Sequence, residues 1–136
     1  KVYGFLPMPP MPPRTQDTVA RASAVRAVLS HVEAHPQSAL CLAPEGRDLL
    51  DGQLSWPPSG AGRFILLLAA RGMPVLPVGG WEQDGALQVR FGEPYRLKIP
   101  VIDGWQMTKE RDRLAAGIVM RSIAALLPES MRGEFA

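Results

Sequence analysis

The chain has 136 residues and a formal net charge of +2, so it fits one domain with a sizeable buried core. Its 15 basic and 13 acidic residues are scattered, which excludes the strongly basic surface that binds nucleic acid. A single cysteine, Cys41, excludes an internal disulfide, and no apolar run reaches the ~18 residues of a membrane-spanning helix. Because the chain shows no signal peptide and starts without methionine in a predicted strand, we expect a portion of a longer protein.

The N-terminal part predicts a short strand, a proline-rich segment and a long helix. Residues 2–6 read as the strand, and the prolines of residues 7–13 exclude helix or inner strand there. Residues 15–34 predict an amphipathic helix that ends before Pro36. Its apolar stripe has three- and four-residue spacing and consists of Ala22, Val25, Leu29 and Val32.

The middle of the chain predicts a buried strand followed by a long loop. Residues 39–43 are continuously apolar, as expected of a strand covered on both faces of a parallel sheet, and Cys41 is then a buried hydrophobe. The loop over residues 44–60 is longer than most connections, and such loops are often functional. Trp56 in this loop either lines a groove or anchors the loop by packing.

The remaining segments predict an α/β fold. A buried helix from Gly60 to Gly72 leads to a strand over residues 74–78, and both strand–helix–strand units should be right-handed crossovers with parallel neighbours. Asp84-Gly85 indicates a hairpin. We therefore expect a single domain over residues 1–136, with a mixed, mostly parallel sheet flanked by helices and an antiparallel hairpin edge. A C-terminal helix over residues 108–127 faces inward through Ala115, Ile118, Ser122, Ile123 and Leu126, with a loose tail from Glu129.

Three sequence blocks in this order resemble the glycerophospholipid acyltransferase family. Ala43-Pro44-Glu45-Gly46 is similar to the Phe-Pro-Glu-Gly-Thr-Arg block of the family, and Gly60-Ala61-Gly62-Arg63 to the start of its next helix. Met73-Pro74-Val75-Leu76-Pro77-Val78 is similar to its Val-Pro-Val-Val-Pro-Val strand, and Phe91-Gly92-Glu93-Pro94 is a weaker match. The resemblance implies the C-terminal portion of an acyltransferase-like α/β domain.

The catalytic block of that family is missing. The family uses His-x-x-x-x-Asp, in which the histidine deprotonates the acceptor hydroxyl. Neither His31 nor His35 fits, because Pro36 and Leu40 stand five positions on. We expect this block upstream of Lys1, so no catalytic residue lies in the chain and the chain alone is inactive.

The resemblance implies an acceptor site built on five residues: Glu45, Gly46, Arg47, Arg63 and Arg14. The glutamate would orient hydroxyls or a basic phosphate ligand, with an exposed loop carboxylate as the alternative. Backbone donors at the helix start beside Arg63 favour anions. Arg47 and Asp48 replace the family's threonine and arginine after Gly46, and Arg14 is the nearest substitute for its phosphate-binding arginine. For Arg14 and Arg63 the alternative is a solvated surface arginine.

We expect neither a metal nor a cofactor. His31 and His35 are four residues apart, a spacing that a metal could use, but no cysteine or carboxylate joins them in a recognised arrangement.

The family resemblance predicts transfer of an acyl group from acyl-CoA or acyl-carrier protein to a hydroxyl of a glycerophosphate-type acceptor. The alternative is a non-catalytic homologue that binds lipid phosphate or a partner protein. A serine hydrolase is excluded, because the sequence has no Gly-x-Ser-x-Gly elbow. We expect the chain in the cytoplasm, free or peripheral at the cytoplasmic membrane face, with a membrane surface as a further partner and no nucleic acid.

Overall fold

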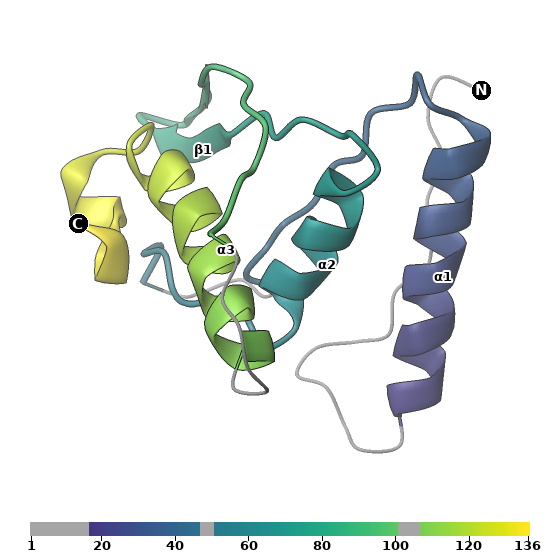
Figure 1. Ribbon diagram of the computed structural model, residues 1–136. Helices are drawn as coiled ribbons and strands as arrows, with labels where there is room; N and C mark the ends of the chain where they lie inside the picture. The colour runs from purple at the N-terminus through teal and green to yellow at the C-terminus, as the bar shows by residue number, and fades with distance from the viewer. Residues whose placement is uncertain (1–16, 47–50, 101–106) are drawn as a thin grey trace.

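The computed structural model describes residues 17–46, 51–100 and 107–136. In chain order they form α1 (Thr18–Ala34), α2 (Ala61–Ala69), the strands β1 (Val78–Gln83) and β2 (Ala86–Phe91), and α3 (Met107–Ala124). Two short 3-10 helices, η2 (Glu129–Met131) and η3 (Gly133–Phe135), follow. Helix α2 lies between α1 and α3, and β1 lies at the upper end of α3 (Figure 1). No described helix is long and apolar enough to cross a membrane.

The main core lies where α2 and α3 meet. Ile65 packs there with Leu97, Ala115 and Val119. Gly62 allows the helices to approach closely, because a Cβ at this position would overlap the Asp112 carbonyl. The small residues at this contact therefore set the distance between α2 and α3.

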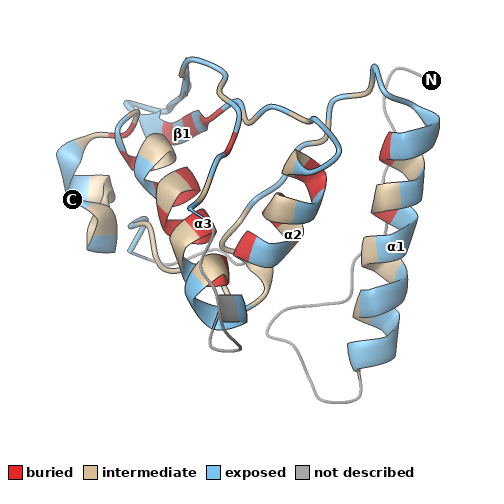
Figure 2. Cartoon of the chain, in the orientation of Figure 1, coloured by how far each residue is buried: buried red, intermediate tan, exposed pale blue. Residues whose placement is uncertain are grey.

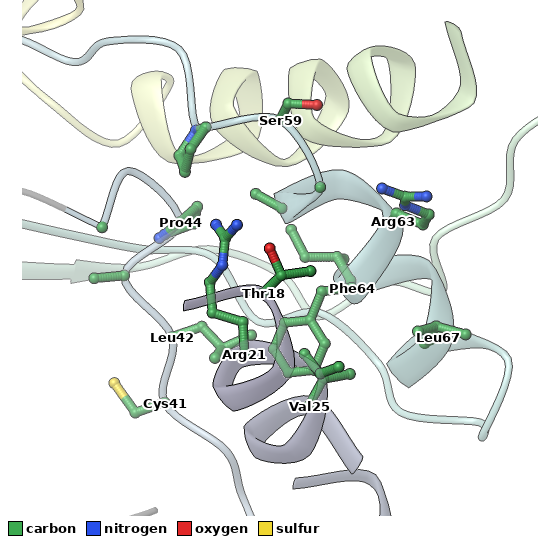
Figure 3. A pocket seen from close by; sticks show the side chains of 17 residues that line it. Thr18, Arg21, Val25, Cys41, Leu42, Pro44, Ser59, Arg63, Phe64 and Leu67 are labelled. Atoms are coloured by element: carbon green, nitrogen blue, oxygen red, sulfur yellow. The ribbon is translucent and has the colours of Figure 1, made fainter. Parts of the chain in front are cut away.

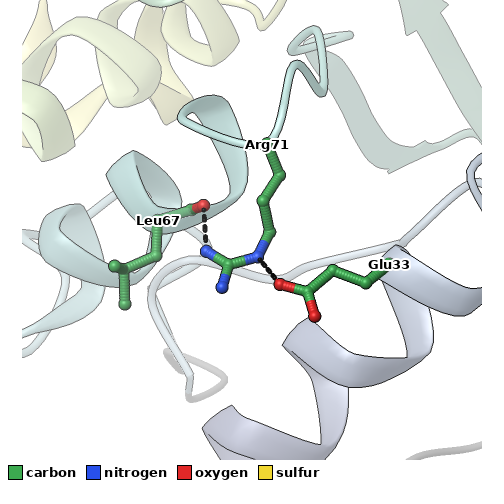
Figure 4. Close-up of polar contacts among 3 residues, drawn as sticks. All are labelled: Glu33, Leu67 and Arg71. Atoms are coloured by element: carbon green, nitrogen blue, oxygen red, sulfur yellow. Dashed lines mark hydrogen bonds and ion pairs between the residues drawn. The ribbon is translucent and has the colours of Figure 1, made fainter.

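Helix α1 makes a smaller contact with α2. Its Val28 and Val32 form a second buried cluster with Leu68 of α2. Arg71, just past α2, donates from Nε to the Glu33 carboxylate over 2.7 Å (Figure 4). Most of the remaining surface of α1 is exposed (Figure 2). The predicted helix is confirmed, and its buried stripe runs through Val28 and Val32 rather than through the exposed Ala22.

The predicted hairpin is also confirmed. Strands β1 and β2 pair antiparallel, with Gln83 opposite Ala86. Asp84 and Gly85 both have positive φ angles, 54° and 74°, which is the geometry of a type I′ turn. The hairpin packs beside the end of α3, where Gly79 lies against Leu126, two residues past the helix.

The expected mostly parallel sheet is wrong. The described residues form one two-stranded antiparallel sheet, so the chain mixes helices and strands without parallel pairing among them. Residues 39–43 form no strand; Cys41 is exposed and Leu42 is 41% exposed. In the predicted strand over residues 74–78, Val75 makes one antiparallel bridge to Tyr95. A buried strand needs a paired neighbouring strand and a layer packed on each face, and no described strand pairs with residues 39–43.

The C-terminal segment departs from expectation as well. Helix α3 ends at Ala124, and its least exposed residues are Ala115, Met120 and Ala124. Ala115 is buried as predicted, whereas the predicted Ile118 and Ile123 are only partly buried against the core. The tail is ordered in 3-10 turns rather than loose, with the Leu54 amide donating to the Met131 carbonyl over 3.0 Å. Trp56 packs on Phe135 with ring centroids 4.8 Å apart and the guanidinium of Arg113 above it. Trp56 thus packs as a loop anchor, and it also lines a small hollow beside α3.

Candidate functional site

The described residues enclose a groove of about 720 Å³. Its walls come from the first half of α1, from residues 41–46, and from the loop that leads into α2 together with the start of α2 (Figure 3). The groove therefore lies beside the segment that the sequence singled out, on the side of α2 that faces α1.

The groove combines apolar walls with two arginines. Val25, Leu42, Phe64 and Leu67 provide much of the apolar surface. The half-buried Arg21 reaches from α1 toward Pro44, whereas the exposed Arg63 lies apart from it, beside the first turn of α2 (Figure 3). This arrangement suits an amphipathic ligand, because an apolar chain has walls to cover it and one cation is near its path.

A tight turn shapes one rim of the groove. The Gly46 amide donates to the Ala43 carbonyl over 3.1 Å, with Pro44 and Glu45 in the central positions. Proline presets the first central φ, and Gly46 has the left-handed φ of 65° that glycine adopts without strain. Pro44 and Gly46 line the groove on either side of Glu45.

The Glu45 carboxylate is committed to the loop. Its Oε1 accepts from the Ser55 amide at 2.6 Å and from the Ser55 hydroxyl at 3.3 Å, and the side chain is half-buried. Glu45 thus joins the two ends of the segment that contains residues 47–50. Both of these bonds hold the carboxylate against Ser55 within the loop, and the orienting role toward an acceptor stays a prediction.

The start of α2 already holds an anion. Asp112 of α3 is 9% exposed, and its two carboxylate oxygens accept from the Gly60 and Arg63 amides, each at 2.7 Å. These amides are among the unpaired donors of the first helical turn, where the helix dipole also favours negative charge. The expectation that this helix start offers its backbone donors to a ligand is therefore wrong for Gly60 and Arg63. The arginine side chain is the part that remains open to the groove.

The structure brings together part of the predicted site. Gly46 and Arg63 line the same groove, and Glu45 lies in the turn at its rim. Arg14 and Arg47 lie outside the described residues.

Sequence reasoning missed two residues of this region, Arg21 and Asp112. Arg21 lies one helical turn before the apolar Val25, so its position on the helix could be predicted from the sequence. The groove that it faces could not be predicted, because it is formed by residues distant in the sequence. Asp112 precedes Ala115 and Ala116 by three and four residues, which places a carboxylate on the buried stripe of α3. An acid on an apolar stripe indicates a paired partner, and that signal was available.

The two histidines of the sequence lie away from the groove. His31 and His35 stack on each other near the end of α1, with ring centroids 4.5 Å apart, and neither lines the groove. Within residues 17–46, 51–100 and 107–136, no group of three or more metal-binding side chains is close enough to hold an ion.

No protein-family model matches the sequence, and neither the curated proteins nor the solved structures give a significant match. The acyltransferase resemblance therefore depends on the short sequence blocks alone.

Removing the Asp112 carboxylate should destabilise the fold. Asp112→Ala leaves the Gly60 and Arg63 amides without their acceptor beside a buried site, and we expect a loss of about 3 kcal/mol in the free energy of unfolding. Urea unfolding followed by circular dichroism measures it. Glu110→Ala, an exposed acid in the first turn of α3, is the control and should change stability by less than about 0.5 kcal/mol. Equal losses in both variants would contradict the assignment.

Proposed function

We propose that the groove between α1 and α2 binds a single-chain anionic lipid, as the acceptor-binding part of a glycerophospholipid acyltransferase. The observation that carries this proposal is the pairing of apolar walls with the half-buried Arg21 in one groove. The sequence blocks around Glu45, Arg63 and Val75 supply the second line of support.

The size and chemistry of the groove fit such a ligand. Its volume of about 720 Å³ lies within the range of small-molecule sites. Each methylene covered by Val25, Leu42 and Phe64 would contribute about 0.8 kcal/mol. A guanidinium binds phosphate oxygens through two parallel hydrogen bonds, so Arg21 is the residue we assign to the headgroup. The acyl donor would be acyl-CoA or acyl-carrier protein.

The chemical step needs a base, and the described residues that line the groove include no histidine or carboxylate. Acyl transfer to a hydroxyl requires removal of its proton, and both histidines of the sequence lie outside the groove. Glu45 is engaged with Ser55. The same observation favours the second candidate, a non-catalytic homologue that binds the lipid and transfers nothing.

Charge removal at Arg21 tests the headgroup assignment. We expect Arg21→Gln to weaken binding of 1-oleoyl-lysophosphatidate about tenfold, because a charge-assisted hydrogen bond in a half-buried site is lost. Binding of 1-monooleoylglycerol, which has the same acyl chain and no phosphate, should be unchanged. Isothermal titration below the micelle concentration of each lipid measures both affinities.

Arg26→Gln is the matched control for this experiment. Arg26 is an exposed arginine of the same helix, it does not line the groove, and it hydrogen-bonds Ser23. The Arg26→Gln variant should bind both lipids with the same affinity as the unchanged chain. Equal weakening in the two variants, or weaker binding of the neutral lipid in Arg21→Gln, would remove Arg21 from the headgroup site.

The chain should not catalyse acyl transfer. Loss of a general base typically lowers the rate by ~10²–10⁴, so release of free thiol from oleoyl-CoA with lysophosphatidate should match the uncatalysed background. A double variant, His31→Gln with His35→Gln, should give the same trace. Turnover that the double variant abolishes would show that a histidine of α1 is the base. Binding of oleoyl-CoA without turnover would favour the acyltransferase portion over the non-catalytic homologue.

A further inference from the structure

The hairpin turns its apolar face to solvent. In an antiparallel pair the residues opposite each other share a face, so Val78 and Phe91 lie on the same side as Val89 and Leu87. Their exposed fractions are 41% for Val78, 68% for Phe91, 46% for Val89 and 74% for Leu87. The opposite face carries Trp81, which is buried. The face of the hairpin that carries Trp81 packs on the rest of the protein, although its β2 residues are the more polar ones. The face that carries Val78, Leu87, Val89 and Phe91 is exposed to solvent.

Strand β2 also presents an open edge. The Gly92 amide donates to the Pro77 carbonyl over 2.9 Å, which fixes the alternation of bonded and non-bonded pairs along the hairpin. By that alternation the backbone groups of Leu87, Val89 and Phe91 point away from β1. No backbone group elsewhere in the described parts of the chain bonds to them. The three most exposed apolar residues of the hairpin therefore also carry its free donors and acceptors.

We propose that β2 pairs with β2 of a second copy of this chain, antiparallel, about a two-fold axis through Val89. Such pairing sets Val89 opposite its own equivalent, and Leu87 opposite Phe91 of the other copy. On the second face, Gln88 lies opposite Arg90 of the other copy, so like charges do not meet. The contact is self-complementary, as a two-fold interface requires, and joins two hairpins into one four-stranded sheet.

Two other occupants fit the hairpin less well. Self-pairing of β1 about Gly80 would place the Glu82 carboxylate opposite the apolar Val78. A lipid surface with anionic headgroups would be repelled, because the acids Glu82, Asp84 and Glu93 lie around the apolar residues, whereas Arg90 lies on the opposite face over Trp81. Pairing of β2 leaves the flanking acids Asp84 and Glu93 at the exposed ends of the contact, where salt screens them.

The dimer should be weak and should strengthen with salt. Six-residue strands bury less than the ~1,200 Å² of a stable interface, which places the contact among transient ones. In the proposed register Gly85 lies opposite Glu93 of the other copy, so Asp84 and Glu93 approach each other at the rim. Higher ionic strength screens this repulsion and favours the lateral contact of Leu87 with Phe91 of the other copy.

Sedimentation velocity from about 1 µM to about 1 mM protein tests the proposal, because weak interfaces of this size associate in that range. The unchanged chain should shift from monomer to dimer as its concentration rises. Val89→Lys should remain monomeric at every concentration, since two ammonium groups would meet on the axis. Val19→Lys is the control: Val19 is an apolar residue of α1 with 76% exposure, and its lysine variant should dimerise as the unchanged chain does.

Hydrogen exchange at low and high protein concentration identifies the edge. The amides of Leu87, Val89 and Phe91 should gain protection at high concentration, while those of Gly80 and Glu82 on β1 should not change. Circular dichroism should show that Val89→Lys is folded, because the substituted side chain is exposed. A monomer throughout the concentration range, dimerisation of Val89→Lys, or protection at β1 in place of β2 would overturn the proposal.

Discussion

The carboxylate of Asp112 is the interaction on which the arrangement of the helices depends. It lies on α3, is nearly buried, and binds two amides at the start of α2, 52 and 49 residues away in the chain. Burial of a charge is costly, and here two short hydrogen bonds and the positive end of the helix dipole offset that cost. Gly62, in the same turn, lets α3 approach so closely that the bonds can form.

This contact positions the groove. With one side of α2 held against α3, Phe64 and Leu67 face the gap toward α1 and become groove walls. Since the helix start is occupied by Asp112, a ligand's anionic group has to be bound by side chains rather than by those backbone amides. The proposal for Arg21 follows from that constraint. The proposal for lipid chemistry adds the resemblance of the sequence blocks, which the groove does not by itself require.

The sequence predicted what is local and missed what depends on distant partners. The Asp84-Gly85 turn and the helices α1 and α2 follow from neighbouring residues, including Gly72, whose φ of 82° ends α2 as expected. The strand over residues 39–43 could not be settled this way, because a β-strand needs neighbours that the pattern does not reveal. The same limit explains Cys41, which is apolar in its sequence context and exposed in the fold.

The candidate site shows the same difference between features set by neighbouring residues and features set by distant ones. The Pro44-Glu45-Gly46 turn was readable, because proline and glycine determine their own backbone angles. The partner of Glu45 was not, since Ser55 lies ten residues on in an irregular loop. The role of Arg21 was not predicted for a related reason. The sequence pattern of an amphipathic helix predicts a solvent-exposed arginine, and only the position of residues 41–46 beside it shows that it lines a groove.

Native-state hydrogen exchange at the amides of Gly60 and Arg63 tests the central claim most directly. Both amides donate to a buried carboxylate, so they should exchange as slowly as the helical amide of the buried Leu68, although no helical carbonyl precedes them. Exchange of the Gly60 and Arg63 amides at the rate of the outward-facing amides of Leu87 and Val89 in β2 would contradict the account. The start of α2 would then not be held by Asp112, and the groove would lose its fixed wall.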